Sequence, residues 1–419
     1  MGCVNHARAD PGNGRGRDDR ARYGVTMFAA LMTLFLAATA PLPADADQTK
    51  KIATIAELER ALATAVPGDT ILIAPGNYRG FSAKELHGAK GKPIALRGTD
   101  PDRPPSFGGP IHLSEVTNLS LEHLLITGSS SNGLNIDDGG TFETPSGELV
   151  LRHITVRDCG GSGNHDGIKL SGIKGALIDA CTVERWGRNG SAIDMVGCSD
   201  IRIDACTFRD DEHNPASNGV QMKGGSRNIQ LMRSRFEHAG HRAVNLGGST
   251  GMEFFRPRPE GFEAKDVFVE GCTFVGSNAP IAFVGCDGAR VRFNTFFRPR
   301  KWFMRILQET RDPQFVPCRN GLFSDNLVVY RLSEVATPIN IGPGTAPETF
   351  AFERNYWFAM DSPTRSIPTL PRPETAAAGN IDPLLKDPER GDFGLREQSP
   401  ARGHGADAFQ DRPNESRSK

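Results

Sequence analysis

The sequence predicts an all-β parallel solenoid, a fold made of stacked coils. One pattern recurs across residues 164–248, where HDGIKLSGIKGALIDACTV is followed by SAIDMVGCSDIRIDACTF, NGVQMKGGSRNIQLMRSRF and HRAVNLGGS. Each copy begins with a short strand in which apolar and polar residues alternate, so that its two faces differ. The first three copies then turn at Gly or Ser into a second apolar strand. Repeats of this length are typical of solenoids, propellers and arrays.

The repeat extends over residues 116–358 at irregular intervals. One position closes the second strand of each coil, and it recurs every 22 to 38 residues as His123, His153, Cys181, Cys206, Ser234, Cys272, Asn294, Asn326 and Asn355. The strands are short, rich in Ile, Val, Leu and Phe, and show no helical period. A propeller needs four strands in each blade, which these intervals do not supply. Coils with loops of variable length are therefore the best interpretation.

One amphipathic helix precedes the first predicted strand. Thr54 and Glu57 form a capping box, and apolar residues then recur on one helical face, which predicts a cap helix over residues 54–66. Such a helix would cover the open end of a solenoid. A strand is expected at 70–73, and residues 79–115 are expected to be irregular apart from a strand-like stretch at 93–96.

Residues 1–46 have the features of a secretory signal peptide. Four arginines precede an apolar run over 25–40, and Ala44-Asp45-Ala46 offers a small-x-small cleavage site. The apolar run is too short for a membrane anchor, so we expect no membrane span in the mature form. Export to the periplasm or the medium is the prediction, and the sequence leaves the oligomeric state open.

Charge and cysteine content set further bounds. The chain has 49 Lys and Arg against 50 Asp and Glu, so only local clustering can indicate an anionic partner. Seven of the eight cysteines remain after the signal segment, and there is no CxxC motif. Cys181, Cys206 and Cys272 share one position of the repeat, which predicts small buried side chains in an inward column. Disulfides and metal binding are the alternatives, and a zinc site is not expected.

The segment PGDTILIAPGNY at residues 67–78 resembles the first coil of right-handed parallel β-helix proteins of the pectate-lyase-like superfamily. The segment DPLLKDP, with GDFGLREQSPARGHGAD after it, resembles the closing segment of secreted β-helix proteins. These resemblances imply a single-stranded right-handed parallel β-helix over residues 47–405. Its coils are expected at about 70–358, its closing segment at 359–405 and a disordered tail at 406–419.

Polar residues of different kinds gather on one outward face of the predicted coils. Equivalent positions of stacked coils lie about 4.8 Å apart, so an aligned column of the sequence is a column in space. The outward column of the first strand holds Lys169, Asp194, Gln221 and Asn245, and Lys223 lies two residues after this column. The positions just before the strand hold His165, Asp166, Asn218, His241 and Arg242. A solvated face usually carries a scatter of Lys, Glu, Thr and Ser, whereas this composition favours a binding or catalytic groove.

Two long loops are expected beside that face, over residues 252–263 and 298–319. They carry basic residues interleaved with aromatic rings, namely Arg256, Arg258, Arg298, Arg300, Lys301 and Arg305 with Phe254, Phe255, Phe262, Trp302 and Phe303. Long loops on a rigid solenoid often shape a binding face. Cations indicate an anionic ligand and flat rings suit sugar faces, so we expect an acidic polysaccharide. The same composition is used by nucleic-acid-binding proteins, but export argues against nucleic acid.

β-Elimination beside a uronate needs a group that neutralises the carboxylate, a base for the adjacent proton and an acid for the leaving oxygen. Lys223 is the candidate base, and Arg242 would hold the carboxylate. His165 and His241 are alternative proton carriers. Lys169, Gln221, Asn245, Arg256, Arg258 and Arg305 are the candidate substrate-binding residues. Asp166 and Asp194, with Asn218, could bind Ca²⁺ through oxygen atoms.

The segment VQMKGGSRNI and the later RAVNLGGS are similar in layout to the polysaccharide lyases that include chondroitinase B and the β-helical alginate lyases. The resemblance implies that Lys223 is the base. The arginine of that family falls one coil later, where this chain has Gly247, so Arg242 would have to replace it. The His165-Asp166-Gly167 segment also resembles part of the D-P-H-D segment of β-helical mannuronan C5-epimerases, which share the proton-abstraction step.

The sequence therefore predicts an exported enzyme that cleaves a uronate-containing polysaccharide by β-elimination. A glycoside hydrolase on the same fold is the first alternative, with Asp166 and Asp194 as its carboxylate pair. A C5-epimerase remains open as well. The alternative from another class is a carbohydrate-binding surface protein without turnover, because a fold does not determine a function.

Overall fold

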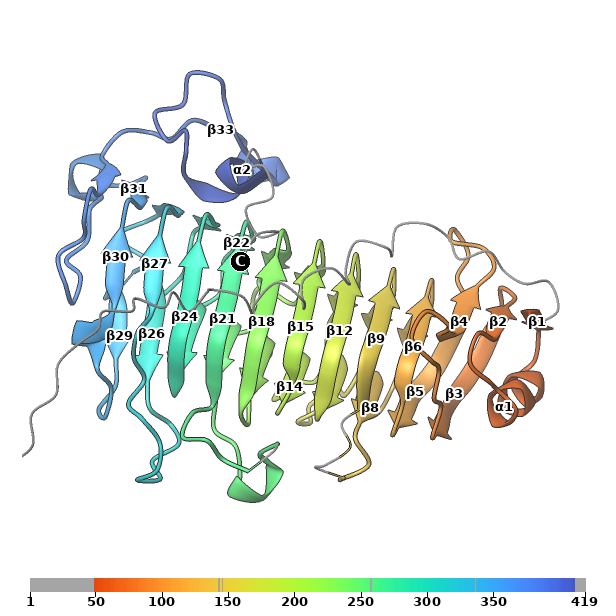
Figure 1. The fold of residues 1–419 in the computed structure, drawn as a ribbon. Helices are drawn as coiled ribbons and strands as arrows, with labels where there is room; N and C mark the ends of the chain where they lie inside the picture. The colour runs from red at the N-terminus through yellow and green to blue at the C-terminus, as the bar shows by residue number, and fades with distance from the viewer. Residues whose placement is uncertain (1–48, 142–143, 145, 257, 336, 411–419) are drawn as a thin grey trace, which may run out of the picture. The chain divides into compact units, whose positions relative to one another are not determined.

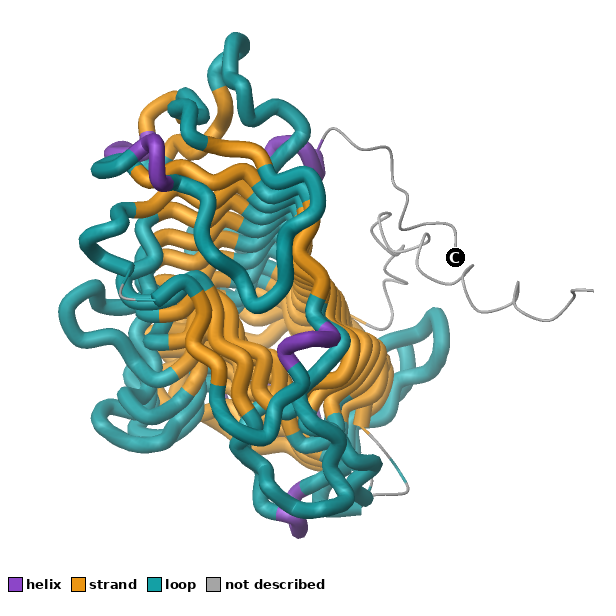
Figure 2. The backbone as a smooth tube through the Cα atoms, turned by 90° about the vertical axis from the view of Figure 1, so that its left-hand side faces the viewer, coloured by secondary structure: helices purple, strands orange, loops and turns teal. Residues whose placement is uncertain are grey.

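The computed structural model describes residues 49–141, 144, 146–256, 258–335 and 337–410, and the predicted signal segment lies outside them. The described chain is a right-handed parallel β-helix, as the sequence predicts (Figure 1). A typical coil holds three short strands, as in β11 (Ile168–Ser171), β12 (Ile173–Asp179) and β13 (Thr182–Glu184). Each strand pairs in parallel with its equivalents in the coils before and after it. Figure 2 shows these strands lying one behind another.

The second strand of each coil joins one 12-stranded sheet. Its members, in spatial order, are β1 (Thr49–Ile52), β2 (Thr70–Ile73), β4 (Ile94–Gly98), β6 (Thr117–Glu122), β9 (Ser146–Arg152), β12, β15 (Ser199–Asp204), β18 (Ser226–Met232), β21 (Ala264–Glu270), β24 (Cys286–Arg292), β27 (Leu322–Ser324) and β30 (Ala351–Glu353). The spatial order of the strands follows their order in the chain, because each coil places one strand next to that of the coil before it.

The first strand of each coil forms the face that carries the polar column, which we call the groove face. It consists of β3 (Asn77–Lys84), β5 (Ser106–Ser114), β8 (Leu134–Asp137), β11, β14 (Ser191–Val196), β17 (Asn218–Lys223), β20 (Arg242–Gly247), β23 (Ala279–Val284), β26 (Met304–Leu307) and β29 (Ile339–Ile341). The third face holds β7 (Leu125–Thr127), β10 (Thr155–Arg157), β13, β16 (Thr207–Arg209), β19 (Arg235–Glu237), β22 (Thr273–Val275), β25 (Thr295–Phe297), β28 (Leu327–Tyr330), β31 (Tyr356–Ala359) and β32 (Ala378–Gly379).

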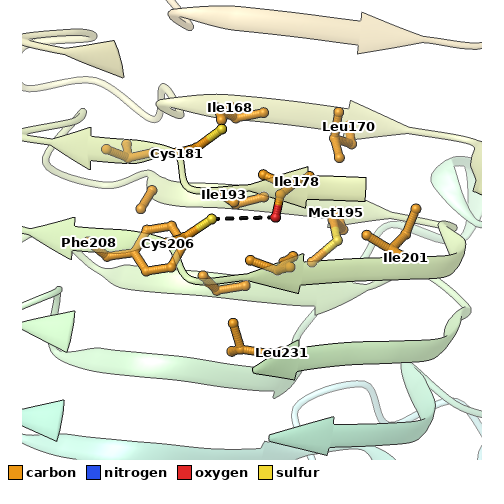
Figure 3. Close-up of a cluster of buried hydrophobic side chains, with 14 of the residues drawn as sticks. Ile168, Leu170, Ile178, Cys181, Ile193, Met195, Ile201, Cys206, Phe208 and Leu231 are labelled. Carbon is orange, nitrogen blue, oxygen red and sulfur yellow. Dashed lines mark hydrogen bonds between the residues drawn. The ribbon is translucent and has the colours of Figure 1, made fainter. Parts of the chain in front are cut away.

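Alternation along the strands fills the core with stacked apolar side chains. Ile168, Ile193 and Val220 pair in register on the groove face and are fully buried. Figure 3 shows such a cluster, in which the Cys206 thiol donates to the Ile178 carbonyl. A column of Phe rings from β16, β19, β22 and β25 stacks with centroids 4.7 to 4.9 Å apart. This close packing makes the groove face a rigid support.

The turn that follows the second strand of each coil carries an inward column, and Cys181, Cys206 and Cys272 are buried there, as predicted. The seven cysteines of the described residues are all buried and free. The alignment of His123 and His153 with this column was wrong by one residue. Both have positive φ at the turn, where their rings stack on each other, and the buried column members are the following Leu124 and Ile154.

The N-terminal end is more regular than the sequence indicates. The predicted cap is present as α1 (Ile55–Ala63), with Glu57 N–H donating to Thr54 Oγ1 and Thr54 N–H to Glu57 Oε2. Residues 79–115 are not irregular, because they contain part of β3, β4 and all of β5. Their alternation is interrupted by glycines at a bulge in the β3–β5 register, which hides the strands in the sequence.

The closing segment covers apolar side chains on the third face. Here η4 (Pro363–Arg365) and η5 (Pro388–Arg390) accompany the antiparallel pair β33 (Leu385–Asp387) and β34 (Asp392–Leu395). The expected disorder from residue 406 is wrong for its first part, because α2 (Gly405–Gln410) is helical. Ala406 N–H donates to Thr295 Oγ1, which holds this helix on β25. Residues 411–419 lie outside the described part.

The remaining short helices lie in loops, as η2 (Met252–Phe254) and η3 (Pro347–Thr349). In the described part of the chain, no helix has the length and apolar character needed to cross a membrane.

Candidate active site in the groove

The predicted polar column is present on the groove face. The register joins Lys169 to Asp194, Asp194 to Gln221, Gln221 to Asn245, Asn245 to Ala282, and Ala282 to Arg305. The residues on either side of each member point inward and are buried, so the polar side chains must point outward. Ala282 is the one interruption in this stretch.

A groove of about 680 Å³ lies over this column. Its floor consists of Asp194, Gln221, Asn245 and Arg305. The wall at the strand starts, which we call the strand-start wall, holds Asn164, Asp166, Asn189, Ser191, Ser217, Asn218, His241, Arg242, Asn278, Ala279, Lys301 and Trp302. The opposite strand-end wall holds Lys223, Gly248, Ser249 and Glu309. Strands in parallel register place these residues along two edges, so an extended ligand could lie between them.

Asp194 is the carboxylate of the floor, and only 3% of it is exposed. Its Oδ2 contacts the ammonium groups of Lys169 and, at 3.3 Å, Lys223. Its Oδ1 accepts from Gln221 Nε2 at 3.2 Å. A buried carboxylate is stable only when it is paired and hydrogen-bonded, and these contacts supply both conditions.

Asp166 lies beside this pair on the strand-start wall. Its Oδ1 accepts from Ser191 N–H at 2.8 Å, and its Oδ2 lies 3.6 Å from Lys169 Nζ. Burial, with a further contribution from the Asp194 carboxylate, raises the pKa of Asp166 to about 6. Burial opposes the charge of Lys169, but Asp194 and Asp166 outweigh it and raise the pKa of that ammonium. Lys169 therefore offsets part of the charge of the two carboxylates, and it is not among the residues that line the groove.

Side-chain amides connect this acidic end to the cationic end. Gln221 Oε1 accepts from Asn218 Nδ2 at 2.7 Å and from Asn245 Nδ2 at 3.1 Å. Arg242 Nη1 then donates to Asn245 Oδ1 at 3.3 Å. Arg242 thus reaches the floor from the strand-start wall, while Lys223 reaches it from the strand-end wall. A hydrogen-bonded floor of this kind fixes both cationic head groups.

The cationic end combines two arginines with an aromatic ring. Arg305 Nε donates to Asn340 Oδ1 at 2.9 Å, and its guanidinium carbon lies 4.7 Å from the centroid of Trp302. Lys301 Nζ lies 4.5 Å from the same ring. Arg242 Nη2 donates to Glu309 Oε1 at 2.7 Å. This end therefore offers a flat ring and charged donors, which suit a sugar with a carboxylate.

His241 is the candidate proton carrier of the strand-start wall. Its Nδ1 lies 2.9 Å from Asn278 Nδ2. An amide can present either nitrogen or oxygen, so this contact can hold the ring in either neutral tautomer. Burial lowers the pKa of His241, and nearby Arg242 lowers it further against the opposing effect of Asp210. The ring is therefore neutral at pH 7 and can accept a proton.

The structure places four predicted site residues outside the groove lining, namely Lys169, described above, and three others. His165 packs against Gly160 and Gly163 of its own loop. Arg256 Nε contacts the buried Asp138 at 2.7 Å, which ties the first long loop to the turn after β8. Arg258 lies exposed on the same loop. The sequence shows that this loop is basic but not which way its side chains point.

The second predicted long loop contains strand β26, which places Arg305 in the column itself. Of the five predicted aromatic residues, Trp302 lines the groove, Phe255, Phe262 and Phe303 are buried, and Phe254 is exposed. Sequence reasoning missed Glu309 and Asn278. The alternation in Met304–Leu307 could have revealed β26, whereas no local signal indicates the contacts of Glu309 and Asn278.

The predicted calcium ligands do not form a cation site. Lys169 contacts both Asp166 and Asp194, so a Ca²⁺ ion there would have to displace an ammonium group. Asn218 donates its amide to Gln221 instead of directing an oxygen at the pair. Within the described ranges, no group of three or more His, Cys, Asp or Glu side chains is arranged to hold a metal ion. We therefore assign no step to calcium.

Comparison with known proteins identifies the fold. Residues 106–296 match the family model of the right-handed β-helix region. No curated protein matches the chain. Among solved structures, the pectate lyase Pel9A is 11% identical with a TM-score of 0.50, and the alignment covers 82% of each chain.

Two further solved structures have lower scores. An alginate lyase from Paenibacillus sp. str. FPU-7 is 14% identical with a TM-score of 0.45, over 72% of this chain and 97% of that one. An endo-xylogalacturonan hydrolase from Aspergillus tubingensis is 12% identical with a TM-score of 0.45, over 79% and 100%. At these identities the likeness is one of fold, so the chemistry must be argued from the groove.

Proposed function

We propose that this protein is an exported enzyme that binds a uronate-containing polysaccharide in the groove and cleaves it by β-elimination. The observation that carries the proposal is the convergence of Lys223 and Arg242 on one hydrogen-bonded floor from opposite walls. Arg305, Lys301 and Trp302 extend the same surface. An acidic sugar chain matches these groups in charge and shape.

The reaction requires that the uronate carboxylate be neutralised before the proton on C5 is removed. Arg242 and Arg305 would bind that carboxylate and stabilise the enolate that forms from it. The C5–H bond and the bond from C4 to the glycosidic oxygen break, and a C4=C5 double bond forms. The proton goes to a base, and the leaving oxygen takes a proton from an acid.

His241 is the better base, and Lys223 is the better acid. His241 is neutral because burial lowers its pKa, and it lines the strand-start wall. Lys223 lies on the strand-end wall and forms an ion pair with Asp194 of the floor. An ammonium group held in this way suits a proton donor. A sugar chain between the walls would therefore meet the acceptor on one side and the donor on the other. This assignment moves the role of base from Lys223, which the sequence indicates, to His241, one of the two alternative proton carriers.

Hydrolysis is the second candidate, and one observation favours it. The raised pKa of Asp166, beside a carboxylate that stays paired with two lysines, is a property of a general acid. Against this, both carboxyl groups are almost fully buried, and Asp194 has its oxygen atoms engaged. The contacts of Asp194 leave it poorly placed to attack a sugar or to activate water.

The test uses the mature protein with a panel of polyuronates and sulfated glycosaminoglycans. Ultraviolet absorbance of an unsaturated uronate and the release of reducing ends are followed together. We expect both to rise, and we expect His241→Ala and Lys223→Ala each to lower the rate by at least about 100-fold. His213→Ala and Lys174→Ala are matched controls, because both side chains are exposed outside the groove lining.

The possible outcomes separate the candidate functions. Reducing ends without absorbance, lost in Asp166→Asn, would establish hydrolysis. Binding without either signal would leave a carbohydrate-binding protein. No binding to any member of the panel would overturn the proposal.

A further inference from the structure

Glu309 is the one carboxylate among the described residues of the strand-end wall. Its Oε1 accepts from Arg242 Nη2 at 2.7 Å, and the two side chains are 35% and 19% exposed. It also acts on Arg305. Burial lowers the pKa of that guanidinium and Arg242 lowers it further, whereas Glu309 opposes the shift. Glu309 therefore places a negative charge near both arginines.

The backbone that carries Glu309 is anchored on both sides. Gln308 Oε1 accepts from Cys318 N–H at 2.7 Å, and Gln308 Nε2 donates to Thr310 O at 2.8 Å. The Thr310 hydroxyl donates to Glu263, which is fully buried. These contacts fix the loop at the two neighbours of Glu309. The carboxylate can therefore leave Arg242 by rotation of its own side chain but not by movement of the loop.

The same buried Glu263 anchors the rest of the strand-end wall. Its Oε2 accepts from Gly224 N–H at 2.8 Å, next to Lys223. Its Oε1 accepts from Thr250 N–H at 2.9 Å, next to Ser249. Lys223, Ser249 and Glu309 are thus each next in sequence to a residue that donates a hydrogen bond to Glu263. The wall that presents Glu309 to Arg242 is therefore fixed by hydrogen bonds to the buried Glu263 carboxylate.

We propose that Glu309 is a built-in substitute for the substrate carboxylate, which occupies the Arg242 guanidinium until an acidic sugar displaces it. The inference rests on the proposed function and adds a specificity-determining residue to it. A uronate would exchange one carboxylate for another at Arg242, so its binding would cost the loss of an internal ion pair. A neutral sugar could not offset that loss, and the groove would therefore reject it.

Glu309→Gln tests the exchange, because it removes the charge and keeps the size of the side chain. Binding of oligogalacturonate and oligomannuronate is measured by calorimetry in the His241→Ala background, where turnover is not expected to consume the ligand. We expect Glu309→Gln to tighten binding by about fivefold, because the internal competitor is lost. The same variant in the otherwise native enzyme should lower KM by a similar factor.

Glu334→Gln is the matched control for this experiment. It makes the same change in net charge and breaks a comparable ion pair with Arg298, away from the groove lining. Binding to this variant should match that of the unaltered background. If Glu309→Gln weakens binding or leaves it unchanged, Glu309 is only a support for Arg242 and the inference is wrong. If neither the His241→Ala protein nor the native enzyme binds either oligosaccharide, the proposed function is wrong and the inference about Glu309 loses its basis.

Discussion

At the scale of single residues, the groove depends on charges that are buried but compensated. Asp194 is shared between Lys169 and Lys223, and a hydrogen bond from Gln221 occupies its other oxygen. Removing one partner from such a cluster leaves the others buried without compensation. The cluster should therefore matter for stability as well as for activity.

Asp194→Asn should lower the free energy of unfolding by about 3 kcal/mol, because two ammonium groups would lose their common carboxylate. Urea unfolding followed by circular dichroism measures the change. Asp158→Asn serves as a comparison, since it breaks an exposed pair with Arg185 and should cost less than about 1 kcal/mol. Equal losses in the two variants would show that the buried cluster has no special weight.

The pH dependence of the rate distinguishes a lyase with His241 as its base from a hydrolase with Asp166 as its acid. The pKa of His241 is lowered from 6.5, so a lyase that uses it as the base should gain activity as pH rises through values below 6.5 and keep that activity above them. A hydrolase that needs protonated Asp166 should lose activity as pH rises through about 6. Initial rates across this range decide the matter, and a profile that rises only at alkaline pH would favour Lys223 as the base.

At the scale of elements, the groove owes its shape to strands that start and end in register. Residues at or just before the starts of β11, β14, β17, β20, β23 and β26 form one wall, and residues at or just after the ends of β17, β20 and β26 form the other. The strand-end wall is held from beneath by Glu263, whose acceptor oxygens connect the turn after β17 with both long loops. Loops on a rigid scaffold place reactive groups accurately only when such anchors fix them.

Glu263→Ala should loosen this wall, because buried donors of Gly224, Thr250 and Thr310 would lose their acceptor. Each unsatisfied donor costs roughly 1–3 kcal/mol, so a fall of at least about 2 kcal/mol in unfolding free energy is expected. The rate should fall by a larger factor than in Glu260→Ala, where the pair with Arg227 is exposed. A variant with native stability and native rate would refute the role of Glu263.

The sequence predicts elements well where each coil repeats the last. The alternation in β11, β14, β17 and β20 is regular, and the column from Lys169 to Asn245 follows directly from it. Where loops vary, the prediction fails. The turns at His123 and Ala180 each hold one residue with positive φ, and the alignment is wrong by one because it places His123 at the inward position that follows this residue. Glu309 and Glu263 act through contacts between distant loops, and no repeat encodes such contacts.

At the scale of the whole molecule, net charge is uninformative but its distribution is not. Four cations and three carboxylates line the groove, and Lys169 adjoins Asp194 outside the lining, in a chain of formal net charge −1. The surplus lies at the end formed by Arg242, Lys301 and Arg305. Attraction of an anionic chain to this end should thus be local and sensitive to salt.

Raising the salt concentration should therefore increase KM for a polyuronate much more than it changes kcat. Arg305→Gln should weaken this dependence, because it removes one cation of the groove and leaves the size of the side chain similar. Arg227→Gln removes an exposed cation outside the groove and should not alter the dependence. Identical salt dependence in native enzyme and Arg305→Gln would place substrate binding elsewhere.

The central claim is that the groove cleaves a uronate chain by elimination, and product mass tests it most directly. A defined oligouronate is incubated with the enzyme, and the two fragments of each cleavage are weighed by mass spectrometry. Elimination predicts that the fragment masses add up to the mass of the substrate, with the unsaturated fragment lost in His241→Ala. Fragments that together exceed the substrate by one water would contradict elimination and establish hydrolysis.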